Sequence, residues 1–179
     1  GGFTDGSGNG SIFVGNFSDE MVGVYRQIGE ASFLDRAASS GIGQLSILTL
    51  AFGLKLADFN LDGYLDLFVA NGHVEETIET VRDNVTYRQR PHLFLSKNNG
   101  RFEDAAPDIA GFGEYVGRAV AVGDIDGDAD PDLLLVENGG GVHLWINESE
   151  GQALHISLSG VTSNRDGLGA RVDLWRAGR

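Results

Sequence analysis

Two acidic stretches of nine residues, 66 positions apart, constrain this chain more than any other feature of its sequence. The first reads DFNLDGYLD from Asp58 and runs directly into the apolar residues 67–70. The second reads DIDGDADPD from Asp124 and runs into the apolar residues 133–136. Each stretch therefore places alternating oxygen donors at the mouth of a short strand that a folded chain would bury.

The correspondence extends to residues on both sides of the acidic stretches. The pairs at this offset are Leu54 with Val120, Leu56 with Val122, Asp62 with Asp128, and Leu67 with Leu133. The unit is a strand, an acidic loop and a second strand, and residues 22–37 and 92–106 both add a third strand, a turn and the pattern Phe-x-Asp-x-Ala. The charged insert at 74–90 has no sustained period and is predicted to be an exposed loop.

These repeats predict an all-β fold. Short runs of Val, Ile, Leu and Phe, with 27 glycines and only 3 prolines, favour many strands joined by tight turns. Tandem units of about four antiparallel strands are typical of β-propeller blades, whereas a β-sandwich, the main alternative, does not require tandem repetition. At roughly 45 residues per blade the chain holds three to four blades, and closed rings take about four to eight. We therefore predict an incomplete ring, whose open faces are covered by further blades, by a partner or by copies of the same chain.

The charge of the chain limits its partners. A formal net charge of −13 argues against nucleic acid and anionic membrane surfaces and favours cations and basic partners. The absence of cysteine excludes thiolate metal sites, and no apolar segment of 18 residues is present, so no membrane insertion is predicted. The first residue is Gly1, without an initiator methionine or a secretory apolar segment, which indicates a processed chain or a fragment.

The alternating donors of each acidic stretch predict a metal site. In an extended loop, positions 1, 3, 5 and 9 can converge on one point, with a backbone carbonyl from position 7. The predicted ligands are Asp58, Asn60, Asp62, Tyr64 and Asp66 in the first loop, and Asp124, Asp126, Asp128, Asp130 and Asp132 in the second. Two carboxylates about 4 Å apart repel by roughly 1 kcal/mol in water and about 4 kcal/mol at a dielectric constant of about 20, so we expect a cation to hold each loop closed. An all-oxygen set without histidine or cysteine favours calcium over zinc or magnesium.

Two other interpretations apply to an acidic loop of this kind. An EF-hand would need a glutamate at position 12 and a following helix, but that position is Val69 in the first loop and Leu135 in the second. An ordinary acidic turn solvated by water is the other alternative. It is less easily dismissed for the second loop, because Ala129 stands where the first loop has Gly63, and a Cβ is penalised if the turn requires a positive φ.

Residues 58–70 and 124–136 resemble the calcium loops of FG-GAP or VCBS-type repeats in integrin-like β-propellers. Residues 162–172, TSNRDGLGARV, are similar to the signature of the ASPIC/UnbV module, which follows such repeats in secreted bacterial proteins and in the cartilage acidic protein group. The resemblance implies one calcium ion per loop, a propeller region at 1–148 and an ASPIC/UnbV-like β segment at 149–179. It also implies that the chain is the C-terminal portion of a longer protein. A third loop at the N-terminus would use Phe3, Asp5, Ser7, Asn9 and Ser11, and its single carboxylate makes a third calcium site near Asp5 doubtful.

The C-terminal residues carry weaker signals. Residues 154–158 and 170–175 alternate like half-buried strands, with a hairpin turn at 164–167 that Asp166 is expected to cap. Arg165 could bind a ligand, but the simpler expectation is that Arg165 and Arg171 pair with neighbouring acids. The remaining candidates are His143 and His155 as ordinary strand histidines, Trp145 and Trp175 as core residues or sugar-stacking rings, and the possible glycosylation sites Asn9, Asn16, Asn84 and Asn147.

The sequence thus predicts an extracellular, secreted, calcium-binding module for adhesion, binding or assembly, with a protein or glycan partner at the cell surface or matrix. A propeller enzyme of the lyase or dehydratase type is the alternative from another class. It is disfavoured because no nucleophile, base and oxyanion-donor set is visible, and because metal sites saturated by protein oxygens leave no open position for catalysis. A carbohydrate-binding lectin and a self-assembling surface or fibre subunit joined through open blade edges remain further alternatives.

Overall fold

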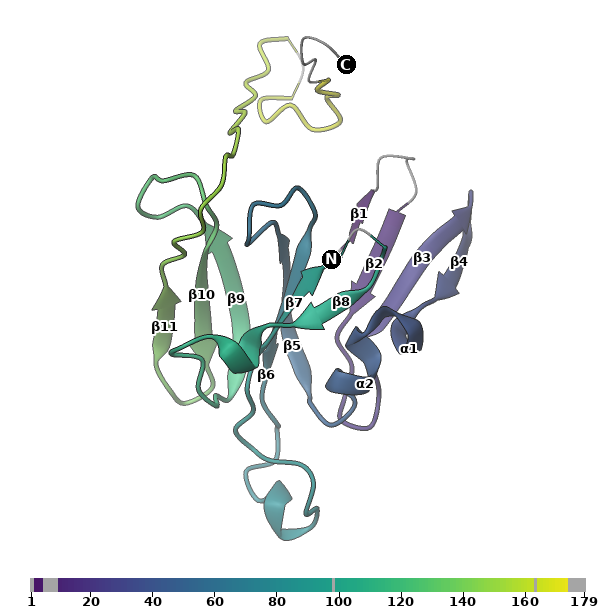
Figure 1. Ribbon diagram of the computed structural model, residues 1–179, viewed down its shortest axis with the longest axis vertical. Coiled ribbons are helices and arrows are strands. Elements are labelled where there is room, and N and C mark those ends of the chain that lie inside the picture. Colours follow the sequence, from purple (N-terminus) through teal and green to yellow (C-terminus); the bar gives the residue numbers. More distant parts are fainter. Residues whose placement is uncertain (1, 5–9, 98, 163, 174–179) are drawn as a thin grey trace.

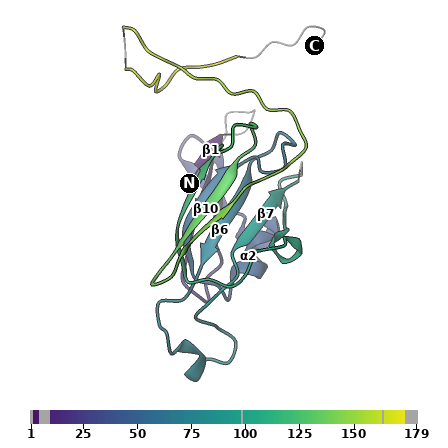
Figure 2. The ribbon, with the colours of Figure 1, turned by 90° about the vertical axis from the view of Figure 1, so that its left-hand side faces the viewer.

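The computed structural model of the chain contains three antiparallel sheets and very little helix. It describes residues 2–4, 10–97, 99–162 and 164–173. Figure 1 shows the sheets side by side, with the second in the middle, and Figure 2 shows the same arrangement from the side. The three sheets confirm the all-β class. Because the described residues form no closed ring, the propeller is not shown.

Each sheet follows the order of its strands in the chain. Sheet 1 consists of β1 (Gly2–Thr4), β2 (Gly10–Val14), β3 (Gly23–Gly29) and β4 (Ser32–Asp35). Sheet 2 consists of β5 (Ala51–Ala57), β6 (Asp66–Asn71), β7 (His92–Ser96) and β8 (Phe102–Asp104). Sheet 3 consists of β9 (Gly117–Gly123), β10 (Asp132–Glu137) and β11 (Val142–Trp145), and among the described residues it has no fourth strand.

The predicted repeat is confirmed at the level of strand register. Leu56 lies opposite Leu67 in sheet 2, and Val122 lies opposite Leu133 in sheet 3, which is the same pairing at the predicted offset. Both acidic stretches connect the first two strands of their sheets. We call residues 58–65 loop 1 and residues 124–131 loop 2.

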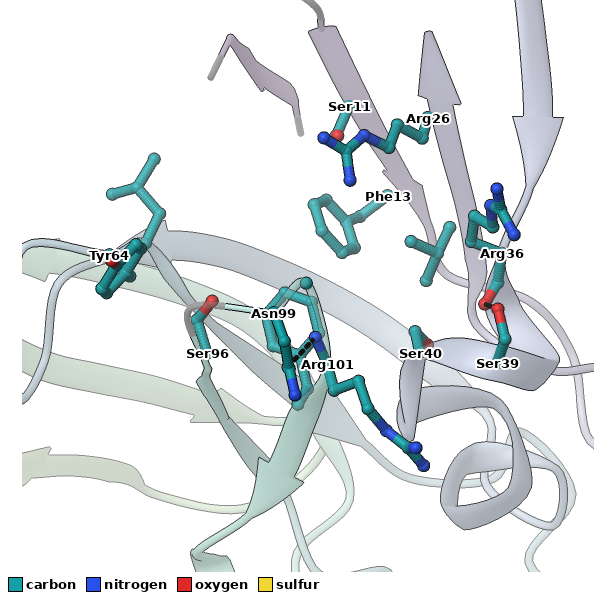
Figure 3. A pocket seen from close by; sticks show the side chains of 14 residues that line it. Ser11, Phe13, Arg26, Arg36, Ser39, Ser40, Tyr64, Ser96, Asn99 and Arg101 are labelled. Atoms are coloured by element: carbon teal, nitrogen blue, oxygen red, sulfur yellow. Dashed lines mark hydrogen bonds between the residues drawn. The ribbon is translucent and has the colours of Figure 1, made fainter. Parts of the chain in front are cut away.

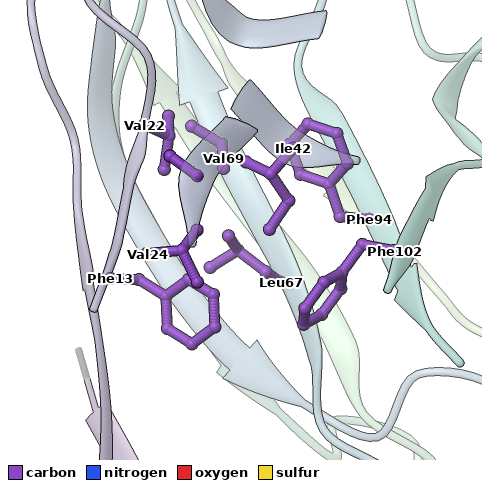
Figure 4. Close-up of a cluster of buried hydrophobic side chains, with 9 residues drawn as sticks. Phe13, Val22, Val24, Ile42, Leu67, Val69, Phe94 and Phe102 are labelled. Atoms are coloured by element: carbon purple, nitrogen blue, oxygen red, sulfur yellow. The ribbon is translucent and has the colours of Figure 1, made fainter. Parts of the chain in front are cut away.

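The middle sheet buries both of its faces, which explains the apolar run after loop 1. Leu67 and Val69 pack toward sheet 1, whereas Phe68 and Ala70 pack toward sheet 3, and all four are 0 % exposed. The core between sheets 1 and 2 also contains Phe13, Val22, Val24, Ile42, Phe94 and Phe102 (Figure 4). The core between sheets 2 and 3 also contains Phe59, Leu93, Phe112, Tyr115, Leu133 and Leu135.

The repeated Phe-x-Asp-x-Ala pattern forms a capped turn in both places. Oδ1 of Asp35 accepts a hydrogen bond from the amide of Ala37 at 2.8 Å, and Oδ1 of Asp104 accepts one from Ala106 at 3.1 Å. The first turn continues into α1 (Ala37–Ser40) and α2 (Ile42–Ser46), and the second into the 3-10 helix η2 (Ala106–Asp108). Each turn is followed by a glycine of positive φ, which is Gly41 at 92° and Gly111 at 93°.

Two segments differ from expectation in part. The insert 74–90 is mostly irregular and projects from one end of the molecule (Figure 1), but it includes the 3-10 helix η1 (Ile78–Thr80) and buries Ile78 and Val85. The strands predicted at 154–158 and 170–175 are not formed, because the described residues from 150 to 173 contain no strand and residues 174–175 lie outside the described part. Alternation alone does not make a strand here, since Leu154 and Ile156 are left 63 % and 51 % exposed.

Candidate metal centre

Loop 1 folds around the carboxylate of Asp58. Oδ1 of Asp58 accepts the amide N–H of Asp62 at 3.0 Å, and Oδ2 accepts that of Gly63 at 2.8 Å. Asn60 donates its side-chain amide to Oδ2 of Asp62 at 3.0 Å, while Oδ1 of Asp62 accepts the N–H of Tyr64 at 2.9 Å. The side chains of positions 1, 3 and 5 are thus held together on one side of the loop.

Loop 2 repeats this arrangement with three carboxylates. Oδ1 of Asp124 accepts the N–H of Gly127 at 2.7 Å, and Oδ2 accepts that of Ala129 at 3.2 Å. One ligand oxygen from each of Asp124, Asp126 and Asp128 lies within 4.8 Å of the others, close enough to share one ion. In loop 1 the middle position is the amide Asn60, so that loop brings two carboxylates together in place of three.

The backbone path of the two loops is the same although their glycines are not. Loop 1 has positive φ at Leu61 (54°) and Gly63 (91°), and loop 2 has it at the corresponding residues Gly127 (86°) and Ala129 (80°). The strain expected at Ala129 from the sequence is therefore present, because a residue with a Cβ is disfavoured in this region.

The aspartates at position 9, Asp66 and Asp132, are buried at the start of the second strand. Oδ2 of Asp66 accepts the N–H of Phe59 at 2.9 Å, and Oδ1 accepts that of Ser96 at 2.7 Å. Asp132 makes the corresponding bonds to Ile125 at 2.6 Å and Asn147 at 2.8 Å. Both carboxylates therefore fasten the loop to its own sheet, at the last residue of β7 in sheet 2 and just after β11 in sheet 3, a bracing role that the sequence did not suggest.

The residues at position 7 differ between the loops. Tyr64 is 46 % exposed, whereas Asp130 is only 2 % exposed. Oδ2 of Asp130 accepts the N–H of Ser149 at 2.7 Å, but Oδ1 is buried without a partner among the described residues. The prediction assigned only the carbonyl of Asp130 to the site, so the burial of its side chain is a further feature of loop 2.

Burial and mutual repulsion perturb the acids of both loops. Burial raises the pKa of Asp66 to about 6, and the nearby charges of Asp62 and Asp58 contribute in the same direction. The pKa of Asp126 is raised by desolvation and by the neighbouring charge of Asp128, and that of Asp130 is raised by burial and by the same neighbour. A bound cation would oppose each of these shifts, since it favours the ionised carboxylate.

Loops 1 and 2 are joined by the residues that follow β11. The carbonyl of Phe59 accepts hydrogen bonds from Nδ2 of Asn147 and from Oγ of Ser149, both at 2.8 Å. An ideal Cβ on Gly151 would lie 2.4 Å from Cβ of Leu61, so the chain passes directly over loop 1. The sequence showed Asn147 and Ser149 only as a glycosylation triplet, and no local pattern indicated this contact.

The possible N-terminal site lies mostly outside the described residues. Phe3 and Ser11 face each other in the ladder of β1 and β2, whereas Asp5, Ser7 and Asn9 are not described. Only residues 5–9 separate the paired strands, compared with residues 58–65 and 124–131 in the other two sheets. The first position of the N-terminal stretch, Phe3, belongs to the ladder, whereas the first positions of loops 1 and 2, Asp58 and Asp124, do not.

The remaining candidates have mainly structural contacts. Trp145 packs against Phe112 with ring centroids 4.8 Å apart, and Nε2 of His143 lies 2.6 Å from Oε1 of buried Glu137. Asn164, not Asp166, caps the C-terminal turn, since its Oδ1 accepts the N–H of Leu168 at 2.6 Å.

The predicted ion pair of Arg171 is formed with Asp173 at 2.9 Å, whereas no ion pair of Arg165 with a described residue is observed. His155 lies in no strand and has its Nδ1 3.9 Å from Asp124, and Trp175 is outside the described part. Of the described sequons, Asn84 is exposed, whereas the side-chain amides of Asn16 and Asn147 donate to backbone carbonyls.

Comparison with known proteins agrees with the repeat. A comparison with curated proteins finds no match. Residues 83–135 match the family model described as an FG-GAP-like repeat. The matched residues run from the insert to β10 and include all of loop 2, so the chain contains an FG-GAP-like repeat and the three clustered aspartates lie within it.

Proposed function

We propose that this chain is a non-enzymatic, calcium-stabilised repeat module that binds a protein or glycan outside the cell. The observation that carries the proposal is the cluster of Asp124, Asp126 and Asp128 on the hairpin loop of an FG-GAP-like repeat. Loop 1 presents a related set on the same hairpin of the neighbouring sheet. No helix among the described residues is long and apolar enough to cross a membrane.

The donor set of loop 2 fits a hard divalent cation. Three carboxylates supply oxygen ligands with no histidine or thiolate in the cluster, which suits calcium. The unpartnered Oδ1 of Asp130 is a second feature that a nearby positive charge would compensate. Calcium would be held by the side chains of positions 1, 3 and 5, with the position-7 carbonyl and the position-9 carboxylate completing the set. When bound, it supplies positive charge that cancels the repulsion among the acids.

The proposed role of the ions is structural. Each loop connects two strands of one sheet, and loop 1 is also tied to the segment after β11 through the carbonyl of Phe59. Closing both loops would therefore stiffen the junction between sheets 2 and 3. An ion surrounded by protein oxygens leaves no position for a reacting group, which favours binding over catalysis. Residues 149–179 are proposed as an ASPIC/UnbV-like segment that continues from this junction.

Calcium titration of the purified chain tests the proposal. Calorimetry should give two sites, and calcium at about 100 times its dissociation constant should stabilise the fold by roughly 2.7 kcal/mol per site. The variants Asp128→Ala and Asp62→Ala should each lose one site, whereas Asp83→Ala, an exposed acid outside both loops, should keep two. Unchanged melting temperatures with and without calcium, or equal calcium loss in all three variants, would refute the assignment.

Self-assembly is a second candidate that one observation favours. The outward face of sheet 3 carries two rows of apolar cross-strand neighbours, which are Ala119, Val136 and Val142, and Ala121, Leu134 and Leu144. Val142 and Leu144 are 62 % and 48 % exposed. On the equivalent face of sheet 2, Phe68 and Ala70 are fully covered.

By analogy, the open face of sheet 3 would be covered by another sheet, and sheet 1 of a second copy could supply it. Sedimentation of the wild-type chain and of Leu144→Asp tests this second candidate. Concentration-dependent dimers or larger species that the variant abolishes would support it. A wild-type monomer at all concentrations would exclude it.

A further inference from the structure

A cleft of about 570 Å³ lies between sheets 1 and 2, next to loop 1. Sheet 1 borders it with Ser11, Phe13 and Arg26, and loop 1 borders it with Tyr64 and Leu65. The end of β7 and the turn after it contribute Ser96, Asn99 and Arg101. The start of α1 contributes Arg36 and Ser39 (Figure 3). The cleft shares residues with loop 1, but none of the side chains clustered there as possible metal ligands lines it. Tyr64 borders the cleft with its side chain and would offer the metal site only its carbonyl.

The charge of this cleft is opposite to that of the protein. The chain has a net charge of −13, yet three of its arginines line this one cleft and none of the described lining residues carries a carboxylate. Figure 3 shows Arg26, Arg36 and Arg101 on different sides of the space. Within the described ranges, the guanidinium groups of Arg36 and Arg101 form no ion pair, so their charge is available to a ligand.

The fold itself does not require arginine at two of these three positions, as the second inter-sheet cleft shows. A cleft of about 350 Å³ lies between sheets 2 and 3 and is lined mainly by apolar side chains. Phe13 pairs with Val24 in sheet 1, and Phe68 pairs with Leu93 in the same way in sheet 2. Two residues further along the same strands, Arg26 of the first cleft therefore corresponds to Leu95 of the second.

Arg36 likewise follows the capping residue Asp35 as Ala105 follows Asp104. The repeat thus accepts leucine and alanine at two positions where the first cleft has arginine. An alanine would pack the position of Arg36 without collecting positive charge, and Arg36 forms no ion pair within the described ranges, so this arginine points to a ligand.

We propose that the first cleft binds a saccharide that carries an anionic group, either a carboxylate or a sulfate. Guanidinium groups form strong charge-assisted hydrogen bonds to both anions. The ring of Tyr64 at the rim offers an apolar surface for a sugar ring, and Ser39, Ser96 and Asn99 offer hydroxyl and amide groups for its hydroxyls. The volume is within the usual range for small-ligand sites. The saccharide would contact the ring of Tyr64, whereas the proposed metal site would use only the backbone carbonyl of that residue, so saccharide binding does not require calcium.

Calorimetric titration of the full chain tests this proposal. The probes are a digalacturonate, a sulfated disaccharide and neutral lactose, each in resin-treated buffer and in calcium buffer. The proposal expects at least one anionic disaccharide to bind in both buffers, more weakly at higher salt, and lactose to bind at least tenfold more weakly. Which anionic probe binds more tightly identifies the carboxylate or the sulfate as the recognised group.

Three variants locate the binding site. Arg36→Gln and Arg101→Gln should each weaken binding roughly tenfold or more, consistent with the loss of a charge-assisted hydrogen bond. Arg90→Gln, which removes an exposed arginine outside the cleft, should bind like the wild type. Unfolding temperatures equal to that of the wild type would show that both cleft variants are folded, and either one alone suffices for the comparison.

Several outcomes would overturn the proposal. Equal binding of lactose and the anionic sugars would remove the role of the arginines. Equal affinity in all three variants would place binding elsewhere, and the absence of binding by every sugar probe would reject a saccharide ligand. A hexaglutamate peptide that bound in this cleft more tightly than any sugar would show that the occupant is an acidic peptide.

Discussion

The exchange of glycine between the two loops leads to a prediction about stability. Ala129 adopts a φ of 80°, and the corresponding Gly63 adopts 91°. This left-handed conformation costs a residue with a Cβ about 1–2 kcal/mol, and glycine adopts it without that cost. The amide of Ala129 donates to Oδ2 of Asp124, so the hydrogen bond that fixes this conformation does not depend on the side chain.

Replacing Ala129 by glycine should therefore stabilise the protein. The relief of about 1–2 kcal/mol is partly offset by the greater flexibility that glycine gives the unfolded chain, about 0.4–1 kcal/mol. The net gain is about 0.5–1 kcal/mol, or roughly 1–4 °C in Tm for a chain of this size. The reverse change, Gly63→Ala, should cost about as much, because an ideal Cβ there has no atom within 4 Å and only the backbone is strained.

Urea unfolding of both variants beside the wild type is the appropriate assay. It should be run in metal-free buffer, where a change in calcium affinity cannot contribute to the difference. Opposite signs for Ala129→Gly and Gly63→Ala would support the reasoning. A loss of stability in Ala129→Gly, or a gain in Gly63→Ala, would show that the two loops do not share this backbone path.

In metal-free buffer, the free energy of unfolding should fall by up to about 3 kcal/mol as pH rises from 4 to 7. Burial raises the pKa of Asp66 to about 6 in the folded chain, compared with 3.8 in the unfolded chain. Between these values the folded chain retains a proton that the unfolded chain has lost, so a rise in pH favours unfolding. Urea midpoints across this range should show the fall without calcium and little or none of it with calcium; identical profiles would contradict the prediction. Gly41→Ala should cost about 2–4 kcal/mol in urea unfolding, since its Cβ would lie 2.3 Å from the carbonyl oxygen of Phe102, whereas Gly111→Ala, with 3.7 Å to its nearest neighbour, should cost about 1–2 kcal/mol. Equal losses would mean that the close contact of Gly41 is not maintained. Glu137→Gln should cost about 1–3 kcal/mol of stability, because it removes the charge of a buried carboxylate that binds His143 and Arg88. Glu103→Gln, at an exposed ion pair with Lys97, should change stability by less than about 1 kcal/mol.

The strands around the acidic loops were predictable because their pattern is local and repeated. Leu54 and Leu56 alternate before loop 1, the apolar run follows it, and the same pattern recurs at a fixed offset, which fixes both the hairpin and its register. The side chains of positions 1, 3 and 5 could be assigned to one side of the loop for the same reason. Short spacing is enough to determine which of these residues meet.

The contacts between sheets were not predictable in this way. Asn147 and Ser149 reach the carbonyl of Phe59 across about half the chain, and no spacing rule connects them. The arginines of the first cleft come from three separate turns and strands, so their proximity appears only when sheets 1 and 2 are packed together. The C-terminal alternation at 154–158 failed as a predictor because Leu154 and Ile156 remain more than half exposed, and an alternating strand needs a surface that covers its apolar face.

The aspartate at position 1 explains why both loops keep one path with different glycines. Asp58 accepts the amides of Asp62 and Gly63, and Asp124 accepts those of Gly127 and Ala129. In each loop the two oxygens of one carboxylate therefore bend the backbone back over it, and the left-handed residues follow from that bend. Glycine lowers the cost of the bend wherever it falls, but it does not set the path. The same hydrogen bonds leave lone pairs on both oxygens, so the group that shapes the loop is also available as the first ligand of a cation.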